Sequence, residues 1–76
     1  MSKTLFEDIL NDIVRRHQGD KNTLVIICHS NGEKTITSYQ YLIVEDDYLM
    51  LTKTNDDNMC QYILYGAITA IYSDNA

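Results

Sequence analysis

The stretch Thr23–Val44, TLVIICHSNGEKTITSYQYLIV, decides the fold. Its first part, residues 23–29, is β-branched and aliphatic on both alternating faces, which predicts a strand that is covered on two sides. Asn31-Gly32 follows and favours a tight hairpin, because both central positions of a type I′ turn need a positive φ. Residues 34–44 then predict a second, long strand. Its apolar positions change parity near Ser38, and a bulge or sharp bend there explains the change.

The segment before this hairpin predicts an amphipathic helix over about residues 5–18. Apolar residues recur at helical spacing and form one stripe, which consists of Leu5, Phe6, Ile9, Leu10, Ile13 and Val14. Thr4 and Glu7 have the spacing of a capping box at the start of the helix. Gly19 is placed to end it in a left-handed conformation.

The rest of the chain predicts three further strands, so that one helix precedes five antiparallel strands. The predicted strands span about residues 23–29, 34–44, 48–53, 59–65 and 67–72, with a hinge at Gly66 between the last two. Strands that are apolar on both sides favour closure of the sheet, or pairing of its edges between subunits. We therefore predict one α+β, mainly β domain over residues 1–76, built as a strongly bent five-stranded antiparallel sheet or small barrel.

Length and charge narrow the class of function. The chain has 76 residues, with 6 Lys and Arg against 11 Asp and Glu, which gives a net charge of −5. This balance argues against a protein whose affinity rests on neutralising many phosphates. So short a chain buries a marginal core, and association with other subunits is a usual remedy. The sequence has neither a long apolar run nor the pattern of a signal peptide, so we expect a cytoplasmic protein with no membrane contact.

Few side chains could carry chemistry. We expect Cys28 and Cys60 to be reduced thiols rather than a disulfide, because cytosolic proteins rarely keep one. With His17 and His29 they are the soft metal ligands of the chain, and no Cys-x-x-Cys or His-x3-His spacing accompanies them, so we expect no metal and no cofactor. His29 lies beside Ser30, but no glycine-flanked nucleophile turn surrounds that serine. The sequence therefore favours a protein that is not an enzyme.

The order of elements and several short motifs resemble the Sm-like fold and, within it, the bacterial Hfq branch. Ile9-Leu10-Asn11 leading to Arg15-Arg16 is similar to Hfq's Phe-Leu-Asn before an arginine-rich helix end, and Asn31-Gly32 falls where the first Sm motif has its hairpin. Residues 46–53, DDYLMLTK, are similar to that motif's Asp-x-Phe, aliphatic run and Lys. Residues 64–71, LYGAITAI, align without a gap with the second motif, Tyr-Lys-His-Ala-Ile-Ser-Thr-Val.

The resemblance implies a ring of identical subunits that binds single-stranded RNA or a nucleotide, with the edge strands 59–65 and 67–72 pairing between subunits. It places the family's aromatic stacker at Tyr48. Tyr65-Gly66 replace the family's Lys-His pair, so that aromatic surface remains where basic charge is lost, and Arg15 and Arg16 supply a basic rim. We expect ligand contacts at Tyr48, Tyr65, Arg15 and Arg16. The simpler interpretation is that the tyrosines fill strand surfaces or a subunit interface and that the arginines complement the helix dipole.

A second hypothesis rests on the acidic residues. Carboxylates gather in two predicted turns, at Glu45, Asp46, Asp47, Asp56 and Asp57. As a negative surface they would fit the basic nucleic-acid groove of another protein. The chain would then be a small acidic inhibitor or adaptor, a nucleic-acid mimic of the anti-defence kind that phages and mobile elements use against basic host proteins. The same residues are also typical of solvated turns that bind nothing.

Overall fold

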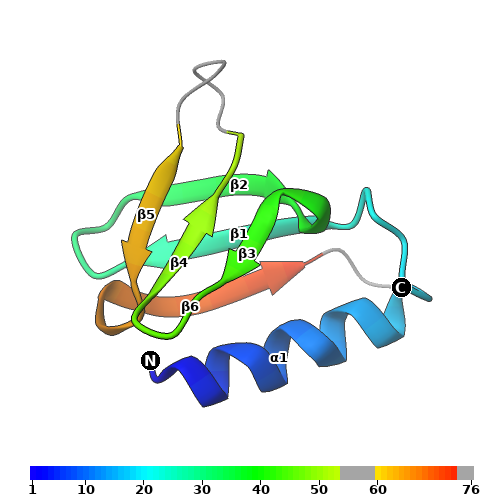
Figure 1. Cartoon of the computed structure of the whole chain (residues 1–76), viewed down its shortest axis with the longest axis horizontal. Coiled ribbons are helices and arrows are strands. Elements are labelled where there is room, and N and C mark those ends of the chain that lie inside the picture. Colours follow the sequence, from blue (N-terminus) through cyan, green and yellow to red (C-terminus); the bar gives the residue numbers. More distant parts are fainter. Residues whose placement is uncertain (54–59, 74–76) are drawn as a thin grey trace.

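The computed structural model describes residues 1–53 and 60–73. These residues form one α-helix and two small antiparallel sheets, so the protein is α+β and mainly β (Figure 1). In chain order the elements are α1 (Lys3–Arg16), β1 (Leu24–His29), β2 (Lys34–Ser38), the 3₁₀ turn η1 (Tyr39–Tyr41), β3 (Leu42–Val44), β4 (Tyr48–Leu51), β5 (Gln61–Leu64), the 3₁₀ turn η2 (Tyr65–Ala67) and β6 (Ile68–Ser73). One sheet has the order β2-β1-β6 and the other β3-β4-β5.

Two 3₁₀ turns divide the chain between the sheets. The predicted strand 34–44 is interrupted by η1, which ends β2 at Ser38 and starts β3 in the other sheet. In the same way η2 separates β5 from β6. The sharp bend expected near Ser38 is therefore confirmed, but the expectation of five strands in one bent sheet or barrel is wrong. In the described residues six strands form two sheets that do not close into a barrel. Tyr39 of η1 packs against the core, and the chain therefore turns there instead of continuing β2 as one strand.

The hairpin at Asn31-Gly32 joins β1 and β2, but not through the expected type I′ turn. Of these two residues, Gly32 alone has a positive φ, of 89°. The Gly32 N–H donates to the His29 carbonyl at 3.0 Å, and the His29 N–H donates to the Glu33 carbonyl at 2.9 Å. Such a three-residue connection ends in a single left-handed residue. Asn31 contributes its side-chain oxygen, which accepts from the Glu33 N–H at 2.9 Å.

Helix α1 begins and ends two residues earlier than expected. Its cap is Ser2, whose Oγ accepts from the Leu5 N–H at 3.1 Å, so the predicted capping box at Thr4 and Glu7 is wrong. At the other end the Gly19 N–H donates to the Val14 carbonyl at 2.9 Å and the Gln18 N–H to the Arg15 carbonyl at 3.2 Å. This pair of bonds is a Schellman motif. Both Gln18 and Gly19 adopt a positive φ, 57° and 75°.

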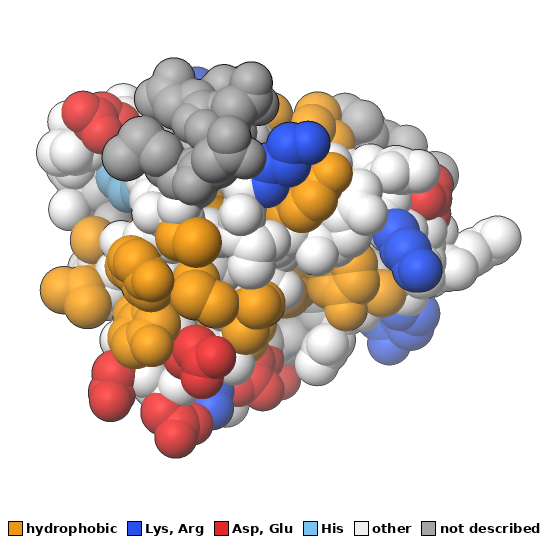
Figure 2. All heavy atoms as spheres, turned by 45° about the horizontal axis from the view of Figure 1, so that its top comes forward, with side chains coloured by type: hydrophobic (Ala, Val, Ile, Leu, Met, Phe, Trp, Pro, Cys, Tyr) orange, Lys and Arg blue, Asp and Glu red, His pale blue; other side chains and the backbone are white. Residues whose placement is uncertain are grey.

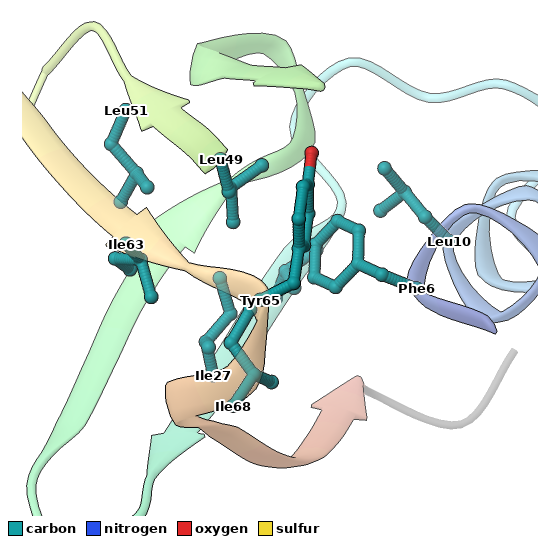
Figure 3. Packing of buried hydrophobic residues seen from close by; sticks show 9 residues of the cluster. Phe6, Leu10, Ile27, Leu49, Leu51, Ile63, Tyr65 and Ile68 are labelled. Carbon is teal, nitrogen blue, oxygen red and sulfur yellow. The ribbon is translucent and has the colours of Figure 1, made fainter. Parts of the chain in front are cut away.

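The core lies between the two sheets and is covered by α1 (Figure 3). Phe6 and Leu10 point from the helix toward side chains of both sheets and of η2. The cluster consists of Phe6, Leu10, Val25, Ile27, Leu49, Leu51, Ile63, Tyr65 and Ile68. Along the described part of the chain there is no helix with the length and apolar character needed to span a membrane.

Candidate binding surface

The sheet β3-β4-β5 has a buried face and an exposed apolar face. Side chains alternate along each strand, and Leu49, Leu51 and Ile63 point inward, where each is at most 3% exposed. The side chains in between point outward. We call this set the outer apolar face, and it consists of Ile43, Tyr48, Met50, Tyr62 and Leu64. Figure 2 shows hydrophobic side chains gathered on one side of the molecule, with acidic side chains along one border of the group.

Cross-strand pairing holds the outer apolar face together. Met50 lies opposite Ile43 on one side and opposite Tyr62 on the other, and Tyr48 lies opposite Leu64. The rings of Tyr48 and Tyr62 meet edge to face, with centroids 5.5 Å apart and planes at 72°. Tyr62 is nevertheless 61% and Leu64 66% exposed. Apolar side chains arranged in this way offer a partner a contiguous contact surface.

The turn between β3 and β4 places carboxylates at the border of this face. Its residues are Glu45, Asp46 and Asp47, all exposed, and the Glu45 N–H donates to the Tyr48 carbonyl at 3.0 Å. Lys3 Nζ lies 2.9 Å from Asp46 Oδ1 and 3.4 Å from a carboxylate oxygen of Glu7. The hydrogen bond with Lys3 lowers the pKa of Asp46, and the bond with Asp46, more than that with Glu7, raises the pKa of Lys3. One ammonium thus binds two carboxylates, and the border stays negative.

Tyr65, expected at a ligand, lies in the core. It is 6% exposed, its ring centroid is 5.7 Å from that of Phe6, and its hydroxyl donates to the Glu45 carbonyl at 2.6 Å. Burial raises the pKa of this phenol. Because the ring is enclosed, it offers no face on which a base could stack, and its role is to anchor the turn at 45–47. Tyr48, by contrast, is half-buried and belongs to the outer apolar face.

Arg15 and Arg16 lie far from Tyr48. Lys3, at the start of α1, contacts the turn at 45–47, whereas the arginines lie at the other end of the helix, about 20 Å away at 1.5 Å per residue. Both bind Asp12, Arg16 through its Nε at 2.8 Å. The bond from Arg16, more than that from Arg15, lowers the pKa of this carboxyl. The structure therefore does not combine the arginines and Tyr48 into one site.

Other expected site residues are partly outside the described chain. Asp56 and Asp57 of the second acidic turn lie outside the described residues, as does the first residue of the predicted strand 59–65. Cys28 and Cys60 are free thiols, Cys28 half-buried and Cys60 exposed. His29 Nε2 lies 2.7 Å from Thr35 Oγ1. Among residues 1–53 and 60–73, no three His, Cys, Asp or Glu side chains are grouped to hold a metal ion.

Sequence reasoning missed four members of the outer apolar face, namely Ile43, Met50, Tyr62 and Leu64. The alternation in Gln61–Leu64 contains the signal, since Tyr62 and Leu64 share one parity and Ile63 has the other. The alternation did not identify the exposed residues, because a strand with apolar residues on both faces can also be fully buried. Comparison with known proteins found no family model, curated protein or solved structure that matches this chain.

Proposed function

We propose that the protein is a non-enzymatic binding module of Sm-like architecture that assembles with copies of itself through β5 and β6. One observation carries the proposal. Within the described chain both strands lie at the edge of a sheet, and they bear three of the large exposed hydrophobic side chains, Tyr62, Leu64 and Tyr72. Tyr72 is 57% exposed.

If β5 in one copy paired with β6 in the next, neither of these two edge strands would remain unpaired. An edge strand presents backbone N–H and C=O groups that another chain can use. A contact between two different edges is head-to-tail, and it closes a ring when the rotation allows. The same pairing would cover exposed apolar surface and add to a small core. The return of the last strand, β6, to pair with β1, together with the bends at η1 and η2, supports a strongly bent Sm-like architecture.

Sedimentation velocity tests the assembly. We expect the unmodified chain to sediment as an oligomer at roughly tens of micromolar, and Leu64→Lys to sediment as a monomer, since an edge lysine blocks strand pairing. Leu5→Lys is the matched control, because Leu5 is 48% exposed but lies on α1. A monomeric unmodified chain would contradict the proposal.

The ligand of the module has two candidate classes. Single-stranded RNA or a nucleotide, which the Sm-like resemblance implies, would use Tyr48 together with nearby positive charge. The structure leaves little of this charge available: Lys3 is held by Asp46, and the arginines lie at the far end of α1. The acidic border of the outer apolar face instead favours the second candidate, a basic protein, and the role of inhibitor or adaptor.

Two binding measurements separate these candidates. Fluorescence anisotropy with a labelled oligouridylate should show no binding at physiological salt if the ligand is a protein, whereas salt-sensitive binding that Tyr48→Ala removes would support RNA. Affinity purification from lysate should recover a basic protein with the unmodified chain and lose it with Glu45→Lys/Asp47→Lys. Glu33→Lys, in the β1–β2 hairpin, is the control that should retain it. Retention by all three chains would contradict a role for the acidic turn.

A further inference from the structure

A groove of about 440 Å³ runs between α1 and β3. One wall of the groove consists of Leu42, Ile43 and Val44, which make up all of β3, and Tyr39 of η1 lies at its end. Glu7, Leu10 and Asn11 of α1 form the other wall. The groove involves neither β5 nor β6, so it is separate from the edges that the proposed self-assembly uses.

The lining shows that the groove follows the open edge of β3. Consecutive strand residues point to opposite faces of a sheet, and here Leu42 and Val44 pack against the core while Ile43 belongs to the outer apolar face. A groove that contacts all three residues cannot lie over one face and must run along the edge. The sheet order agrees, because β3 is the outermost strand of β3-β4-β5.

The hydrogen-bond pattern turns backbone groups of β3 toward this groove. The Thr52 N–H donates to the Tyr41 carbonyl at 2.9 Å and the Glu45 N–H donates to the Tyr48 carbonyl at 3.0 Å, so residues 41 and 45 bond toward the β4 side. Bonding positions alternate in an antiparallel pair, which turns the groups of Leu42 and Val44 to the opposite side. The Leu42 N–H bonds to the Tyr39 carbonyl. The Leu42 C=O and both backbone groups of Val44 then face the groove.

The helix wall adds an apolar base and a negative rim. Leu10 is 5% exposed and lies in the core, whereas Glu7 is half-buried and Asn11 is exposed. Glu7 and Asn11 are four positions apart, so their side chains lie on the same side of α1. Glu7 shares Lys3 with Asp46, which leaves two carboxylates for one ammonium. The groove thus combines strand-pairing groups, apolar surface and a net negative charge.

We propose that this groove binds an extended segment of another protein, which adds to β3 as an outer strand. Peptides bind sheet edges in this way through main-chain hydrogen bonds, and pockets for alternate side chains select the sequence. One apolar side chain of the segment rests on Leu10 and Val44, and a Lys or Arg lies beside Glu7. Acidic segments are excluded by like charge.

The test begins with a displayed library of random peptides of about twelve residues, selected on the full chain. We expect selected peptides to alternate apolar and other residues and to carry a Lys or Arg. Glu7→Lys should weaken binding of a synthetic selected peptide by about tenfold. Glu33→Lys, the same charge reversal in the β1–β2 hairpin, should leave the dissociation constant unchanged.

N-methylation of the peptide tests strand addition without altering the protein. Methyl groups on every second backbone amide should abolish binding in one register, where the amides donate to β3, and be tolerated in the other. Val44→Pro, which removes an edge N–H, should weaken binding by about tenfold if circular dichroism shows the fold retained. No selected peptide, equal effects of the two methylation registers, or equal effects of Glu7→Lys and Glu33→Lys would each overturn the proposal.

Discussion

Tyr65 connects two parts of the molecule through a single side chain. Its ring packs against Phe6 of α1, and its hydroxyl donates to the carbonyl of Glu45 in the turn between β3 and β4. The motif alignment identified this position but gave it the role of a ligand contact. Nothing in the sequence distinguishes a buried tyrosine with a bonded hydroxyl from an exposed one, because the partner is a backbone atom twenty positions away.

Removing the Tyr65 hydroxyl should destabilise the fold. Tyr65→Phe keeps the ring and leaves the Glu45 carbonyl without this donor, so we expect a loss of about 1 kcal/mol in the free energy of unfolding, measured in urea. Tyr62→Phe is the control, since Tyr62 is 61% exposed and its change should be close to zero. Equal losses in both variants would show that the hydrogen bond contributes nothing.

The same phenol should make the stability of the fold decrease at high pH. Burial raises the pKa of Tyr65 above its ordinary value of 10.0, so the folded state holds the proton more firmly than the unfolded state. The stabilisation that this gives is complete below pH 10 and decreases as the pH rises through the folded-state pKa. The unmodified chain should have a higher free energy of unfolding than Tyr65→Phe, and urea unfolding between about pH 8 and 11 should show this difference decreasing as the pH rises. A constant difference across this range would contradict the assignment.

Gln18 occupies a backbone conformation that side chains disfavour. Its φ is 57° in the Schellman motif that ends α1. Gln18→Gly should therefore stabilise the protein by about 0.5–1 kcal/mol in urea unfolding. Gly19→Ala should do the opposite, because φ there is 75° and alanine would introduce the strain that glycine avoids. The prediction fails if Gln18→Gly is neutral or destabilising.

Helix α1 shows what periodicity can and cannot determine for an element. The apolar stripe predicted the helix and its buried face, and Phe6, Leu10 and Ile13 are indeed buried. The start was misassigned because Ser2 and Thr4 are both suitable caps, and the Thr4–Glu7 spacing favoured the later one. Apolar periodicity cannot choose between the two caps, because either start leaves Phe6 on the buried face of the helix.

The two candidate caps can be separated by substitution. Ser2→Ala should lower the free energy of unfolding by about 1 kcal/mol, because the Leu5 N–H loses its acceptor. Thr4→Ala should change it by no more than a few tenths of a kcal/mol, since threonine is there an ordinary exposed helix residue. Urea unfolding measures both. A larger loss for Thr4→Ala than for Ser2→Ala would restore the capping box.

The strands were located more reliably than their arrangement. The parity change in residues 34–44 correctly indicated a bend, because alternation reports which face a side chain occupies. It could not indicate that η1 transfers β3 to a second sheet, since a bulge and a 3₁₀ turn shift parity in the same way. Sheet membership depends on pairing between distant segments, such as Val25 with Ser73, and no local pattern encodes that pairing.

At the scale of the whole molecule, the small core and the exposed apolar face both favour association with another chain. Six large hydrophobic residues of the described chain are at least 39% exposed, and those on β5 and β6 lie where subunits are proposed to meet. The short length of the chain predicted association with other subunits, but the sequence did not show which side chains would remain exposed. The structure buries Tyr65 and leaves the outer apolar face exposed.

Self-assembly should make thermal stability depend on concentration. If the oligomer is more stable than its subunit, the Tm of the unmodified chain rises with protein concentration by mass action. We expect the same rise for Leu5→Lys and a constant Tm for Leu64→Lys, measured by circular dichroism over about a hundredfold range of concentration. A Tm independent of concentration in all three chains would argue for a monomer.

The position of β1 between β2 and β6 has a consequence for how the protein is made. The β1–β2 hairpin can form as soon as both strands leave the ribosome, but the other partner of β1 comes late in the chain, with Val25 opposite Ser73. An isolated hairpin is marginal in water. Val25 and Ile27 therefore remain exposed to solvent and to chaperones until β6 has left the ribosome, and folding is completed by the slow closure of a long loop.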